Sequence, residues 1–138
     1  MNFSDTKKSK KRIHRIKSLE IPIYHTDIKI ILSDDYEYSW DKAVPKGAEW
    51  AKIPEETRED LKIRVGFTWY SDHFGMLMIH PNYLTAGLIG HECLHLTSYV
   101  MSDISHHLEE GEEPYAYLLE YLIDQSHKAY KGFGFKIK

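Results

Sequence analysis

The amino-acid sequence predicts an α+β fold in which a small antiparallel sheet is followed by two long C-terminal helices. Segments with a hydrophobic period of two lie before residue 81, and a short turn at residues 71–75 separates two of them. Helical periodicity dominates the residues after this hairpin. The order of strands, hairpin and helices places the helices on one side of the sheet. We expect one domain, because 138 residues leave no room for a second catalytic module.

The predicted strands lie in the first 80 residues. From Ser18 to Ser33, isoleucine and leucine alternate with polar residues, as in a half-buried strand. A short helix is expected from Glu55 to Leu61, since its acidic first turn suits the positive end of a helix dipole. Lys62 to Tyr70 and Met76 to His80 then form the two strands of the hairpin.

Two helices are predicted in the second half. The first begins at Asn82 or Thr85 and ends near His107. The second extends from Pro114 to about Lys131, since proline is favourable in a first helical turn. One stripe of the first helix is apolar and is expected to face the core: Ile89, Cys93, Leu96, Val100 and Ile104. The opposite stripe carries His91, His95, Ser98 and Ser102.

Residues 1–17 form a basic N-terminal segment, with seven Lys or Arg residues and one Asp, although the whole chain has a net charge of −3. We expect a flexible arm at residues 1–17 and a single domain at residues 18–138. Residues 7–17 are a candidate contact for nucleic acid or another acidic partner. The alternative is a solvated tail, since chain termini are frequently unstructured. No apolar stretch is long enough to span a bilayer, and cytoplasmic residence is the default expectation, in a host cell if the protein is viral. The sequence does not predict an oligomeric state.

The sequence His91-Glu92-Cys93-Leu94-His95 has the spacing H-E-x-x-H. On a helix, residues i and i+4 lie about 5–6 Å apart on one face, so both imidazoles can reach one ion. Glu92 lies at the rim of that face and can accept a proton from a water molecule without binding the metal. The single cysteine, Cys93, lies on the apolar stripe and is expected to be a small buried residue.

A catalytic zinc ion needs a third protein ligand, and residues 105–124 supply the candidates. Glu113, Tyr117, Glu120 and Asp124 share one stripe of the last helix, and Glu112 lies at its start. The alternative interpretation of this stripe is a solvated acidic face. His106 or His107 is a further candidate, although His106 lies about 16 Å beyond His95 on an unbroken helix.

His91-Glu92-Cys93-Leu94-His95, followed by Glu113-Pro114-Tyr115-Ala116-Tyr117, resembles the gluzincin branch of the zincin metallopeptidases. The similarity is greatest to minimal members, such as the ImmA/IrrE-type peptidases and small phage-encoded HExxH proteins. It covers roughly residues 62–125, and it implies a zincin-like metal site built on the two long helices. It implies that His91, His95 and Glu113 bind Zn²⁺ and that Glu92 is the general base.

The sequence therefore predicts a zinc-dependent hydrolase, namely a metalloendopeptidase acting on a protein or peptide substrate. Tyr117 or Tyr115 is expected to donate a hydrogen bond to the reacting carbonyl, with packing against the core as the alternative role. An extended substrate is expected along the strand from Met76 to His80, if that strand is the sheet edge. The alternative function is a catalytically silent, zinc-stabilised module that binds protein or nucleic acid.

Overall fold

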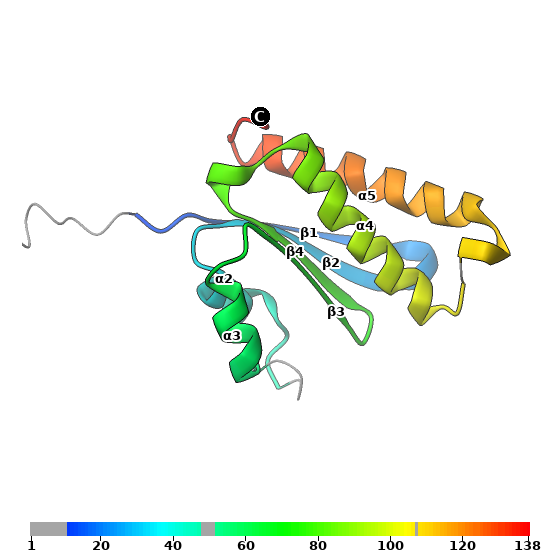
Figure 1. Ribbon diagram of the computed structural model, residues 1–138, viewed down its shortest axis with the longest axis horizontal. Helices are drawn as coiled ribbons and strands as arrows, with labels where there is room; N and C mark the ends of the chain where they lie inside the picture. Colours follow the sequence, from blue (N-terminus) through cyan, green and yellow to red (C-terminus); the bar gives the residue numbers. More distant parts are fainter. Residues whose placement is uncertain (1–10, 48–51, 107) are drawn as a thin grey trace, which may run out of the picture.

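The structure, a computed structural model, describes residues 11–47, 52–106 and 108–138. It confirms an α+β architecture with two long C-terminal helices (Figure 1). The strands are β1 (His14–Ile21), β2 (Thr26–Ser33), β3 (Gly66–Ser71) and β4 (Phe74–Ile79). The helices are α2 (Tyr36–Ala43), α3 (Glu55–Leu61), α4 (Ala86–Asp103) and α5 (Glu112–Gly132). Short 3-10 turns are η1 (Pro22–Tyr24), η3 (Pro81–Tyr83) and η4 (Leu108–Glu110).

The sheet is mixed, and the prediction of an antiparallel sheet is wrong. Its strand order is β1-β2-β4-β3. The pairs β1–β2 and β3–β4 are antiparallel, whereas β2 and β4 are parallel. The parallel pair arises because the chain leaves β2, forms α2, α3 and β3, and only then returns to the centre of the sheet as β4. The predicted hairpin is confirmed, with Asp72 and His73 at positive φ in its two-residue turn.

Strand β4 is central, so the predicted substrate strand from Met76 to His80 is not the edge of the sheet. All six residues of β4 are buried. A continuous apolar strand of this kind is typical of a position covered on both faces. The two edges are β1 and β3.

Helices cover both faces of the sheet, rather than one face as the sequence predicted. Helices α4 and α5 lie on one face, and α2 and α3 lie on the other (Figure 1). Along β4, Leu77 and Ile79 pack on the α4 side, while Met76 and Met78 pack on the α2 side. Helix α2 was not predicted. Its signal is the N-cap Asp35, whose carboxylate accepts a 3.1 Å hydrogen bond from the Tyr38 N–H.

Strand β1 begins at His14, inside the segment that the sequence assigned to a flexible arm. His14 pairs with Ser33 and Lys17 with Ile30, so residues 14–17 belong to the sheet. The Ile13 N–H donates a 3.0 Å hydrogen bond to the Asp34 carboxylate. The boundary at residue 18 is therefore wrong, whereas residues 1–10 of the arm lie outside the described residues. Contact of the arm with nucleic acid or an acidic partner stays a prediction.

In the described part of the chain, no helix has the length and apolar character needed to cross a bilayer.

Candidate metal centre

Helix α4 carries the H-E-x-x-H residues in the middle of one rigid element. The Thr85 hydroxyl caps this helix by accepting a 3.1 Å hydrogen bond from the Leu88 N–H. Ile89, Cys93, Leu96 and Val100 are fully buried, as the predicted apolar stripe requires, whereas Ile104 lies just past the helix and is 38% exposed. Burial of this stripe fixes the rotation of α4, and the opposite stripe therefore faces outward with both histidines.

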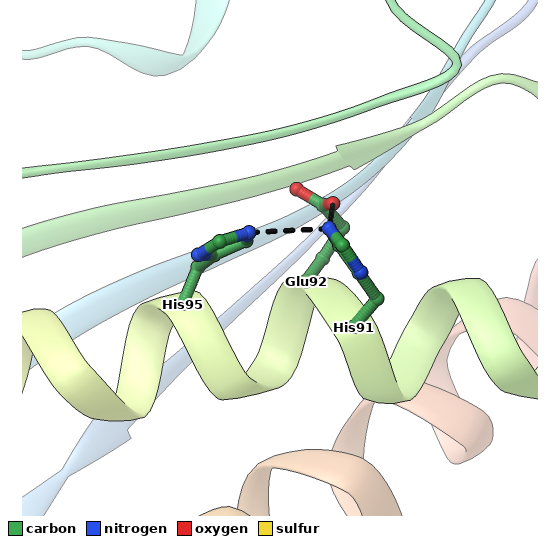
Figure 2. Close-up of side chains that lie close together, drawn as sticks. All are labelled: His91, Glu92 and His95. Atoms are coloured by element: carbon green, nitrogen blue, oxygen red, sulfur yellow. Dashed lines mark hydrogen bonds and ion pairs between the residues drawn. The ribbon is translucent and has the colours of Figure 1, made fainter.

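The two histidines have the geometry of a metal-binding pair. Their Nε2 atoms lie 3.2 Å apart, and both rings are exposed. Two nitrogen ligands at about 2.0–2.1 Å from a tetrahedral zinc ion would lie about 3.3 Å apart. His91, His95 and Glu92 extend from the same side of α4 (Figure 2). Their ligand atoms all lie within 4.8 Å of one another. The donor set, two imidazoles and a carboxylate, suits zinc.

Glu92 is almost buried, with 5% of its surface exposed, and lies between α4 and the edge strand β3. The Thr68 hydroxyl donates a 2.8 Å hydrogen bond to Glu92 Oε1, and it also lies 3.2 Å from the Glu92 carbonyl oxygen. The second carboxylate oxygen, Oε2, lies 3.7 Å from His91 Nε2. One oxygen of the carboxylate is thus held by the sheet, and the other faces the histidines.

Gly66 makes room for this carboxylate. A Cβ atom at Gly66 would lie 3.1 Å from both Cγ and Cδ of Glu92 and 3.1 Å from a methyl group of Leu88. These separations are shorter than ordinary van der Waals contact. A side chain at this position would therefore press on the Glu92 carboxylate.

Helix α5 does not bring its acidic stripe to the histidines. The Cys93 sulfur lies 3.4 Å from the Ser126 hydroxyl of α5. Cys93 points about 200° away from His91 around α4, so this contact lies on a different side of that helix. The Tyr115 hydroxyl of α5 also reaches Ser98 on the histidine stripe, but no carboxylate of α5 in the described part of the chain joins His91 and His95. Of the described residues, the only group of three or more His, Cys, Asp or Glu that could hold a metal is His91, Glu92 and His95.

The predicted third ligand is therefore not brought to the histidine pair. Glu113 and the alternatives Glu112 and Glu120 are exposed residues of α5 outside this group. His106 lies past the end of α4, where its Nε2 is 2.8 Å from the Gly111 carbonyl oxygen. His107 lies outside the described residues.

The two tyrosines considered as carbonyl donors lie in different places. Tyr117 is 66% exposed and borders an apolar groove beside η1, next to the edge strand β1. The candidate metal centre lies beside the opposite edge, β3, so the structure does not support the predicted catalytic role of Tyr117. The Tyr115 hydroxyl instead forms a hydrogen bond with Ser98, which follows His95 by three residues on α4.

Cys93 is a buried core residue, as the sequence predicted. Burial raises the pKa of its thiol to about 11, and the nearby Glu92 charge acts in the same direction. The thiol is therefore neutral at pH 7, which argues against a role as a nucleophile.

Sequence reasoning missed Gly66 and Thr68, the two residues of β3 that hold Glu92. Both left a signal in the sequence. A glycine inside a strand indicates close approach of another group. Thr68 is a hydroxyl residue between Phe67 and Trp69, whose side chains pack on the other face of the sheet. Nothing in the local pattern, however, relates β3 to Glu92.

The fold and site together define an α+β domain with an exposed histidine pair and a buried carboxylate on one helix. Comparison of the chain with protein-family models, curated proteins and solved structures finds no match.

Proposed function

We propose that this protein is a zinc-dependent peptidase that cleaves extended peptides. The observation that carries the proposal is the arrangement of α4: two imidazole nitrogens 3.2 Å apart beside a buried carboxylate. A buried glutamate next to two histidines is not expected on a solvated surface helix, because burying an ionised carboxylate costs free energy unless it is paired. Here Thr68 stabilises the carboxylate, and the open side of the cluster remains accessible.

The residues of the cluster have distinct roles in this proposal. His91 and His95 hold the ion, which when bound supplies Lewis-acid activation of water and of a peptide carbonyl. Glu92 takes the proton from the attacking water and passes it to the leaving amine. Thr68 holds Oε1 of Glu92, so that Oε2 remains directed at the position where the water must lie.

Among the described strands, β3 has a neighbour on one side only, and its free edge is the proposed binding surface for the peptide. The His80 N–H donates a 3.1 Å hydrogen bond to the Val65 carbonyl oxygen. Backbone groups alternate along an antiparallel pair, so those of Gly66, Thr68 and Tyr70 point away from β4, toward the open edge. An extended peptide can add to this edge as a further strand. Its backbone then passes beside Thr68, next to the Glu92 carboxylate.

The second candidate function is a zinc-stabilised binding module without turnover. One observation favours it: within the described ranges, no third protein ligand joins His91 and His95 in addition to Glu92. If Glu92 itself completes the coordination, it is no longer free to act as the base. The two functions therefore differ in what Glu92 does.

Substitution of Glu92 by Gln separates the two functions. We expect about one zinc ion per chain in the wild type, and the same zinc content in Glu92→Gln, as measured by elemental analysis. We also expect the wild type to cleave a fluorogenic peptide library and Glu92→Gln to lose at least about a hundredfold in kcat/KM, the scale of general-base catalysis. His91→Ala should lose both zinc and activity.

His106→Ala is the matched control, because it removes a histidine outside the cluster and should keep both properties. Retention of tight zinc binding by His91→Ala would contradict the proposed site. Loss of zinc in Glu92→Gln, with no cleavage by the wild type, would favour the binding module instead.

A further inference from the structure

A surface cleft continues directly from the candidate metal centre. Its volume is ≈ 480 Å³, and it lies between the edge strand β3 and the outer face of α4. The residues that line it are Thr68, Trp69, Tyr70, Tyr99, Ser102 and Asp103. Two of them touch the metal cluster: Thr68 bonds Glu92, and the ring of Tyr99 stacks on His95 with 6.4 Å between centroids.

The cleft combines aromatic walls with one carboxylate. Tyr70 and Tyr99 supply the rings, since the ring of Trp69 packs against Trp40 on the other face of the sheet. Asp103 lies at the C-terminal end of α4 with 37% of its side chain exposed. Within the described part of the chain, no lysine or arginine lines the cleft. Aromatic faces together with a carboxylate attract a cation, through cation–π contact and through direct ion pairing.

The carboxylate of Asp103 is held in position. The Tyr70 hydroxyl donates a 2.6 Å hydrogen bond to Asp103 Oδ2, and His73 Nδ1 lies 3.4 Å from the same oxygen. Both of these contacts, made by described residues, are to one oxygen, and Oδ1 is the oxygen proposed to meet a ligand. A carboxylate already fixed by its neighbours loses less conformational entropy when it binds a cation.

We infer that this cleft is a specificity subsite for an arginine or lysine side chain of the peptide substrate. The inference rests on the proposed function, because it uses the same peptide on the free edge of β3. Thr68 and Tyr70 are two residues apart, about 6.7 Å along a strand. A peptide residue opposite Thr68 therefore lies at Glu92, and the residue two positions away lies on the same face, at the cleft. Its aliphatic stem contacts the rings, and its charged group reaches Asp103.

Peptide binding to the zinc-loaded Glu92→Gln protein tests the subsite without requiring turnover. The probes are fluorescein-labelled decapeptide libraries in which one position at a time is fixed as Arg, Lys, norleucine or Glu. We expect that at one position Arg and Lys bind about fivefold to tenfold more tightly than norleucine, by fluorescence anisotropy. Glu at that position should bind more weakly than norleucine. Adding Asp103→Asn should abolish the preference, so that Arg and Lys bind no more tightly than norleucine.

Asp60→Asn is the matched control, since Asp60 has a similar side-chain exposure of 43% and pairs with Arg64 outside the cleft. It should leave the preference intact. Equal binding of Arg and norleucine at every position, no binding by any library, or a preference that survives Asp103→Asn would each overturn the subsite. A basic preference that depends on Asp103, in a wild type that cleaves no peptide, supports the subsite and contradicts the peptidase. Cleavage by the wild type without a basic preference supports the peptidase and contradicts the subsite.

Discussion

The Thr68 hydroxyl donates a 2.8 Å hydrogen bond to the carboxylate of Glu92, and this bond joins the edge strand β3 to the helix that carries both histidines. The two residues are 24 positions apart in the sequence. Because Thr68 occupies Oε1, the other carboxylate oxygen is the one that faces His91. The orientation of the candidate general base is therefore set by the sheet.

Replacing Thr68 by valine removes this hydrogen bond at nearly constant volume. Loss of a hydrogen bond to a buried charged group costs about 1–3 kcal/mol, so we expect a roughly tenfold lower kcat with unchanged zinc content. Thr68→Ser, which keeps the hydroxyl, should retain most of the activity. A Thr68→Val protein with wild-type kcat would show that Thr68 does not orient Glu92.

Two glycine substitutions distinguish an effect on the candidate site from an effect on core packing. In Gly66→Ala, the new Cβ presses on Glu92 at 3.1 Å, so peptidase activity should fall with little loss of stability. In Gly75→Ala, the Cβ would lie 2.8 Å from methyl groups of Ile28 and Leu96 in the fully packed core. Overpacking of this kind costs about 1–3 kcal/mol, and we expect a lower free energy of unfolding in urea. If both variants lose the same stability and the same activity per folded molecule, the distinct role of Gly66 is refuted.

Truncation of the N-terminus tests where the domain begins. Deleting residues 1–10 removes no described strand residue, and the melting temperature should stay within about 2 °C of the wild type. Deleting residues 1–17 removes the first half of β1 and the hydrogen bond from Ile13 to Asp34. We expect this deletion to cost about 2 kcal/mol or more, which lowers the melting temperature by roughly 6 °C or more. Equal stability of the two truncated proteins would show that the folded domain begins at residue 18, as the sequence predicted.

Tyr70 should make stability depend on pH above pH 10. Burial raises its pKa to about 12, and the hydrogen bond to Asp103 adds to this effect. The folded state therefore holds the phenol proton more tightly than the unfolded chain, for which the pKa is 10.0. The stabilisation is complete below pH 10 and is lost as the pH rises from 10 to 12.

The difference in absorbance at 295 nm between the wild type and Tyr70→Phe isolates this titration. Its midpoint should lie near pH 12 and should move down in Asp103→Asn, where the neighbouring charge is absent. A midpoint near pH 10 that does not respond to Asp103→Asn would contradict the contact between the two side chains.

Local patterns in the sequence were sufficient for several elements. The hairpin, the helix Glu55–Leu61 and the two long helices were predicted close to their observed bounds. The rotation of α4 followed from its apolar stripe, and this alone placed His91 and His95 on the outward face. These features depend on residues within a few turns of one another, which is where helical and strand periods are informative.

The sequence failed where distant segments meet. The parallel pairing of β2 with β4 and the covering of both faces involve elements separated by long stretches of chain. The uninterrupted apolar run of β4 was a signal for a central strand, but the prediction treated that strand as a possible edge. The edge strand beside the site is β3. The predicted substrate strand, β4, is instead the inner neighbour of β3.

The sequence by itself determined a histidine pair with a carboxylate beside it, because one helical turn brings residues i and i+4 together wherever the helix lies. Only the tertiary structure decided the surroundings of that pair. Packing of α4 against β3 buried Glu92 beside Thr68. Helix α5 contacts α4 through Ser126 and Cys93, and its described acidic residues do not join the two histidines. Which neighbours a helix face meets depends on how helices and sheet pack, and side-chain periodicity within one helix contains no information about the neighbouring element.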